Sequence, residues 1–180
     1  MWTFTKYIAL SFLLFLIMPN EINAQAGDTS SCNSQKTQID ICKYWRSKID
    51  YKMKFLSDPT LDNFSPENVT KAIDCLLKLE GKKGRARFGG AVSLEVSVIF
   101  APSSIEVGAL YYISYLYYQK WEHAMAVALI DEDGNVNSSK VIKKAYSMYK
   151  KWFKKIEEIG LEKARKQKLD PLGGTDVRWY

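Results

Sequence analysis

Apolar residues recur every three or four positions along much of the chain, which is the period of an amphipathic α-helix. The first such pattern predicts a helix over about residues 37–56, and its apolar positions are Ile39, Cys42, Trp45, Ile49, Met53 and Leu56. A second helix is predicted to begin at Ser65, because serine is a good N-cap and Pro66 suits the first helical position. We expect this helix to end at Gly81.

The clearest helical pattern covers residues 138–159. One of its faces is apolar and the other is rich in lysine, and the apolar face comprises Val141, Ile142, Ala145, Tyr146, Tyr149, Trp152, Phe153, Ile156 and Ile159. Gly160 interrupts the pattern, and a second helical piece is predicted over 161–169 before Asp170 and Pro171 end it. Because the apolar face is the only one this helix can bury, Trp152 is predicted to lie in the core.

Between these helices the pattern is mixed. Residues 88–100 alternate apolar and polar positions with valine at several of them, which favours a strand, whereas the helical context leaves a helix open. Ser103 and Glu106 have capping-box spacing, so a helix is predicted from about residue 104 to 121. Residues 124–130 could continue that helix or be extended.

Together these elements predict a mainly α fold, a small single-domain helical bundle over residues 37–180 with room for one or two short strands. The preceding residues 27–36 are small and polar, and we interpret them as a flexible N-terminal arm. The C-terminal Trp179 and Tyr180 are expected to pack on the core as an aromatic plug.

The N-terminus has the three parts of a secretory signal peptide. Lys6 supplies a positive charge, residues 7–18 are almost continuously apolar, and Ala24-Gln25-Ala26 provides the small residues that signal peptidase recognises. We therefore predict a signal peptide at residues 1–26 and an exported chain, periplasmic or secreted, with no transmembrane segment after cleavage. A retained N-terminal anchor is the alternative.

Three cysteines in an oxidising compartment allow at most one internal disulfide. If Cys42 and Cys75 lie in consecutive antiparallel helices joined near residue 61, their positions are staggered by five residues, or about 7 Å. That separation is at or beyond the usual limit for a disulfide, so the spacing favours a Cys32–Cys75 bridge, with Cys42 free and buried.

Positive charge is concentrated at the C-terminal end of the chain. The formal net charge is +6, yet residues 27–139 hold 13 Lys and Arg against 14 Asp and Glu, whereas residues 140–180 hold 12 against 5. The candidate binding face comprises Lys143, Lys150, Lys151, Lys154 and Lys155. Such a face could bind an acidic protein, an anionic lipid surface or an acidic polymer, and a solvated surface is the alternative. Nucleic acid is not expected as a partner because export removes the chain from it.

The chain offers few residues for catalysis or cofactor binding. His123 is its single histidine, and its neighbour Glu122 would point about 100° away from it on a helix. No Cys/His pair has zinc-ligand spacing, and the acidic turn at 131–137 lacks the glycine and the closing glutamate of a calcium loop, which would fall at Val136 and Ile142. No metal or cofactor is predicted.

These features favour a non-catalytic interaction module over an enzyme. The alternative is an envelope hydrolase that acts on carbohydrate or cell-wall material, with Glu95, Glu106 and Glu122 as the candidate carboxylates. Two carboxylates about 5 to 10 Å apart in an aromatic cleft would indicate such chemistry.

Two stretches of the chain resemble known proteins. Residues 65–119, with AIDCLLKLEG and SSIEVGALYYISYLYY, resemble the helix pairs of HEAT-type repeats, although no second copy follows at a fixed period. The sequences EVGALYYISYLYY, AYSMYKKWFKKIEEIGLEKARKQKLDPLGG and VRWY resemble a family of uncharacterised exported bacterial proteins. This second resemblance implies a bacterial envelope setting, and it carries no activity or site residues over to the chain.

Overall fold

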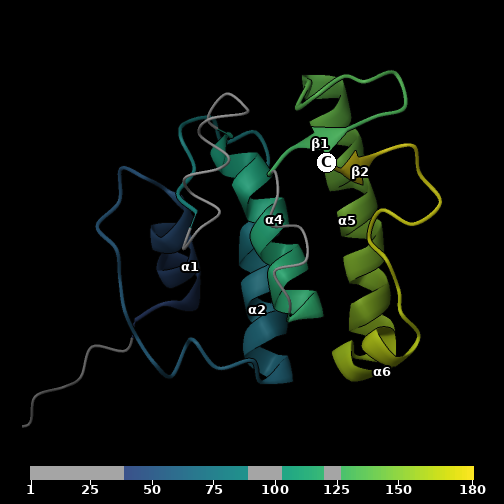
Figure 1. Cartoon of the computed structure of the whole chain (residues 1–180). Helices are drawn as coiled ribbons and strands as arrows, with labels where there is room; N and C mark the ends of the chain where they lie inside the picture. Colours follow the sequence, from purple (N-terminus) through teal and green to yellow (C-terminus); the bar gives the residue numbers. More distant parts are fainter. Residues whose placement is uncertain (1–38, 89–102, 120–126) are drawn as a thin grey trace, which may run out of the picture. The chain divides into compact units, whose positions relative to one another are not determined.

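The computed structural model describes residues 39–88, 103–119 and 127–180. Within them, most residues belong to helices, with one short antiparallel pair of strands (Figure 1). The elements are α1 (Ile41–Ile49), α2 (Pro66–Leu77), α4 (Ile105–Tyr118), β1 (Leu129–Ile130), α5 (Ser139–Ile159), α6 (Leu161–Lys166) and β2 (Arg178–Trp179). The predicted mainly α fold is confirmed.

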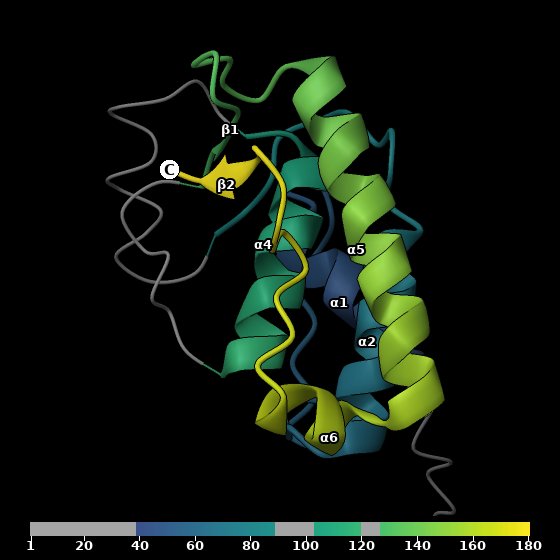
Figure 2. The same ribbon diagram turned by 90° about the vertical axis from the view of Figure 1, so that its right-hand side faces the viewer.

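The helices pack around a shared apolar core. α2 contacts both α1 and α4, and α5 packs against α2 and α4 (Figures 1 and 2). The apolar face of α5 is buried as its period predicts, and Trp152 is only 6% exposed. No helix in the described ranges is long and apolar enough to cross a membrane.

Two of the predicted helix starts are confirmed by their caps. The Ser65 hydroxyl accepts a hydrogen bond from the backbone N–H of Asn68, with Pro66 in the first turn, and the Ser138 hydroxyl accepts one from Val141. These caps satisfy backbone donors that have no partner within the helix.

The helix predicted over 37–56 is shorter than its pattern indicates. α1 begins after the Asp40 cap and ends at Ile49, because Asp50 is extended and forms a bridge with Ala86. Residue 51 onward forms loop structure up to the start of α2. Pairing with a distant segment thus overrides the local apolar period.

The capping box predicted for Ser103 and Glu106 is wrong. Ser104 is the N-cap of α4, and its side chain makes no capping hydrogen bond. The Ser103 hydroxyl donates to the carbonyl of Val127, while the Glu106 carboxylate accepts from the backbone N–H of Gly81 at 2.9 Å. Both side chains are therefore committed to tertiary contacts.

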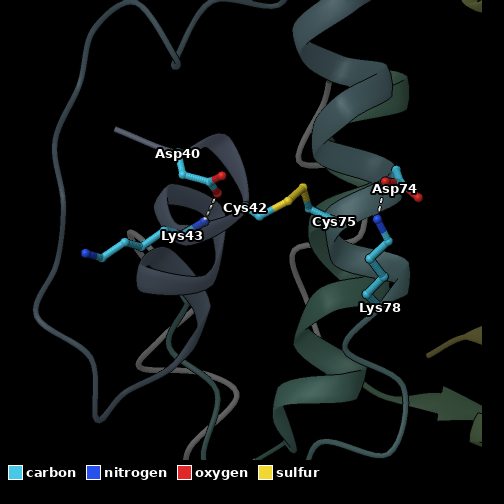
Figure 3. Close-up of a disulfide and its surroundings, with 6 residues drawn as sticks. All are labelled: Asp40, Cys42, Lys43, Asp74, Cys75 and Lys78. Carbon is cyan, nitrogen blue, oxygen red and sulfur yellow. Dashed lines mark hydrogen bonds and ion pairs between the residues drawn. A yellow bond between two sulfur atoms is a disulfide. The ribbon is translucent and has the colours of Figure 1, made fainter. Parts of the chain in front are cut away.

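The predicted disulfide is also wrong. The structure joins Cys42 to Cys75, with Cα atoms 5.1 Å apart, so Cys42 is neither free nor fully buried (Figure 3). Cys42 lies in the first turn of α1 and Cys75 in the last turn of α2, which lie side by side. The stagger estimate fails because residues 50–65 are not helical, so counting residues from a turn does not measure distance along two helices. Cys32 lies outside the described residues.

The C-terminal segment returns from α6 to end beside β1 (Figure 2). Leu129 pairs with Trp179 in the antiparallel strands, and the Trp179 indole N–H donates to the Tyr149 hydroxyl at 3.1 Å. The aromatic plug is thus confirmed for Trp179, whereas the Tyr180 side chain is 61% exposed. Of residues 124–130, those described, from 127 onward, are extended rather than helical.

Some predictions fall outside the described residues. They are the signal peptide and N-terminal arm over residues 1–36, the strand or helix over most of 88–100, the candidate carboxylates Glu95 and Glu122, and the single histidine His123.

Candidate functional site

The outer face of α5 presents the basic residues singled out by the sequence. Its 21 residues span about 30 Å, and the Ser138 cap fixes where it begins. All five predicted side chains are exposed on the side opposite the buried face, and we call them the lysine face: Lys143, Lys150, Lys151, Lys154 and Lys155. A single rigid helix therefore sets their spacing.

Residues that the structure describes leave most of the charge on this face without an ion-pair partner. Lys150 pairs with Glu80, and the neighbouring Lys144 pairs with Asp176. The other four members of the lysine face form no ion pair with any residue that the structure describes. Electrostatic attraction toward an anionic partner is thus available along the helix.

A cavity of about 440 Å³ lies between α4, α5 and the C-terminal segment. Its wall includes Ser114 and Tyr149, whose hydroxyl oxygens are 2.6 Å apart. Burial raises the pKa of Tyr149 well above its ordinary value, which disfavours formation of a reactive phenolate. Tyr118 donates to the Asp170 carboxylate at 3.4 Å and its pKa is also raised, chiefly by burial. These contacts hold the C-terminal segment and supply no activated nucleophile.

Of the three candidate carboxylates, the structure describes Glu106, and its contacts stabilise the fold. Glu106 is 2% exposed, and its carboxylate is occupied by the Gly81 N–H and by Lys83. In the described ranges no three His, Cys, Asp or Glu residues come together as a metal site. The turn after β1 is polar, as predicted, and the Asn135 amide holds the pKa of Asp131 below its usual range.

Sequence reasoning missed an aromatic cleft of about 380 Å³. Its charged wall residues are Lys48, Asp62 and Arg87, and its rings are Trp45, Phe55, Phe64, Tyr112 and Tyr115. The ring residues come from α1, from the loop between α1 and α2, and from α4, so no single stretch of sequence contains them. The signal in the sequence was the group of aromatic residues at 55 and 64, outside any predicted apolar face, together with the basic loop at 81–87 that contains Arg87.

Comparison of the chain with protein-family models, with curated proteins and with solved structures gave no match.

Proposed function

We propose that this protein is an exported, non-catalytic interaction module that binds an acidic polymer through the lysine face of α5. The observation that supports this proposal is the exposure of five lysines on a helix whose opposite face is buried in the core. Four of them lack an ion-pair partner among the described residues, so their positive charge is available to pair with an anionic ligand.

The composition of the lysine face favours a polymer over a membrane. A helix that binds a lipid surface inserts an apolar face, and the apolar face of α5 is already buried. The large apolar side chains that are exposed in the described ranges lie elsewhere: Tyr51, Phe55, Val136 and Tyr180.

The same composition argues against a protein partner. Protein interfaces are enriched in aromatic residues and arginine and depleted in lysine, whereas the lysine face contains neither arginine nor an aromatic residue. From Lys143 to Lys154 the charges extend over about 16 Å of helix. An extended polyanion matches such a row, and its counterions are released when it binds.

Binding to polygalacturonate, a carboxylate polymer, tests the proposal. We expect Lys143→Glu with Lys154→Glu to weaken binding at least tenfold at low salt, and raised salt to weaken binding of the unaltered protein. The control is Lys71→Glu with Lys78→Glu, which changes the net charge equally at exposed positions of α2 and its C-cap.

Three results would contradict the proposal. One is unchanged binding in the α5 variant, and another is an equal loss in the α2 control, which would indicate a response to net charge alone. The third is binding to phosphatidylglycerol vesicles without binding to the polymer, which would favour a membrane surface.

Export is tested separately by N-terminal sequencing of the protein recovered outside the cytoplasm. The predicted cleavage site gives a mature chain that begins at Gly27 or Gln25. Recovery of a membrane-bound form that begins at Met1 would contradict this part of the proposal.

A further inference from the structure

We propose that the aromatic cleft is a second binding site, which takes a small aromatic ring that carries a carboxylate. This inference goes beyond the lysine face because it concerns different residues and a different class of ligand. The cleft volume of about 380 Å³ lies within the range of small-molecule sites.

The walls of the cleft are suited to an aromatic ring. Trp45 and Tyr112 pack with ring centroids 6.2 Å apart, and Phe64 meets Tyr115 edge to face at 5.7 Å. Phe55 completes the lining and is 52% exposed. Aromatic pairs prefer such tilted and edge-to-face arrangements, so a further ring can extend the cluster in the same way.

A ligand rich in hydroxyl groups fits the cleft less well. Its lining consists of five aromatic and three charged residues, and two of the charged residues pair with each other, so most hydroxyl groups would face rings. Hydroxyl groups placed there would lose hydrogen bonds to water without replacing them, which costs free energy. The Trp45 indole N–H is the exception, since this buried donor has no acceptor among the described residues.

The charges of the cleft select the sign of the ligand. The Lys48 ammonium lies 2.8 Å from the Asp62 carboxylate, so this pair is neutral overall. The ammonium also lies 5.1 Å from the centre of the Phe55 ring, where a ligand cation would otherwise bind. A cationic ligand would therefore find this face of the Phe55 ring already occupied.

Arg87 leaves the cleft with an excess of positive charge. Among the described residues its guanidinium donates to backbone carbonyls alone, those of Ser47, Tyr51 and Met53, at 2.9 to 3.1 Å. No carboxylate pairs with it in the part of the chain that the structure describes. A ligand carboxylate would supply the missing counter-charge.

Calorimetric titration of the mature protein with 2-naphthoate tests this site. We expect 2-naphthoate to bind at least tenfold more tightly than 2-naphthylmethanol, which has the same rings without the charge, and the cationic 2-naphthylmethylamine not to bind. Equal affinity of the acid and the alcohol would overturn the assignment of charge, and no binding of naphthoate at millimolar concentration would overturn the site.

A pair of variants locates the binding. Phe55 and Tyr51 are both more than half exposed and both lie about 6 Å from the Arg87 guanidinium, yet only Phe55 lines the cleft. We expect Phe55→Ala to weaken naphthoate binding at least tenfold and Tyr51→Ala to leave it unchanged. Because both side chains are exposed, both variants should keep the circular dichroism spectrum of the parent.

The lysine-face variant separates this site from the proposed polymer site. Lys143→Glu with Lys154→Glu should leave naphthoate binding intact. Loss of naphthoate binding in that variant, or an equal response to Phe55→Ala and Tyr51→Ala, would overturn the assignment to the aromatic cleft.

Discussion

Replacing Trp152 by alanine should lower the free energy of unfolding by about 3 to 5 kcal/mol. The indole is 6% exposed, and its ring lies 4.8 Å from that of Tyr117 and 5.9 Å from that of Tyr149. Its N–H donates to the Leu169 carbonyl at 3.4 Å, which is too long to contribute much. A buried tryptophan removes roughly 200 Å² from water, or about 5 kcal/mol at 25 cal/mol per Å², and alanine keeps part of that burial.

Urea denaturation followed by circular dichroism measures this loss. A typical domain is stable by about 5 to 15 kcal/mol, so the variant should have a clearly lower midpoint. Lys151→Ala is the matched control, because it removes a large side chain at the adjacent exposed position and should change stability by about 0.5 kcal/mol or less. A loss below about 1 kcal/mol for Trp152→Ala would refute the placement of this face of α5 in the core.

Peptide mapping without reduction should link Cys42 to Cys75. Reduction should lower the free energy of unfolding by about 2 to 4 kcal/mol, because the bond closes a loop of 33 residues. Recovery of both cysteines as free thiols in the exported protein would contradict the pairing. Burial raises the pKa of Tyr111 to about 12 and raises those of other core tyrosines. The folded state therefore holds these protons more tightly than the unfolded state, so stability should be constant up to about pH 9 and fall between pH 10 and 12. Urea midpoints measure the stability, and absorbance at 295 nm follows ionisation of the tyrosines. Gly108→Ala should destabilise the fold by about 1 to 3 kcal/mol, because the new Cβ would lie 2.8 Å from that of Ala86. This clash should outweigh the better helix propensity of alanine. A variant that is more stable in thermal denaturation would show that α4 and the segment around Ala86 can move apart.

Local signals predicted where α2 and α5 begin, whereas α2 ends at Leu77 and not at Gly81 as expected. α2 and α5 begin at the serines that the sequence identifies, because a cap bonds a backbone N–H only three residues away. The lysine face could also be predicted, since residues on one helix keep a regular period.

The sequence could not place residues that depend on distant partners. α1 ends early because Asp50 bridges to Ala86, and Glu106 leaves the predicted cap to bond the Gly81 N–H. A local pattern contains no information about which remote backbone group competes for a side chain.

The sequence by itself determined the mainly helical fold, the buried and basic faces of α5, and the position of Trp152 in the core. These follow from the period of apolar residues, which is a local property of the chain. Only the tertiary structure decided that Cys42 meets Cys75, and that rings from α1, the following loop and α4 enclose a cleft beside Arg87. The disulfide joins residues 33 positions apart, and the cleft joins residues drawn from positions 45 to 115, so their geometry is set by how loops return and helices pack.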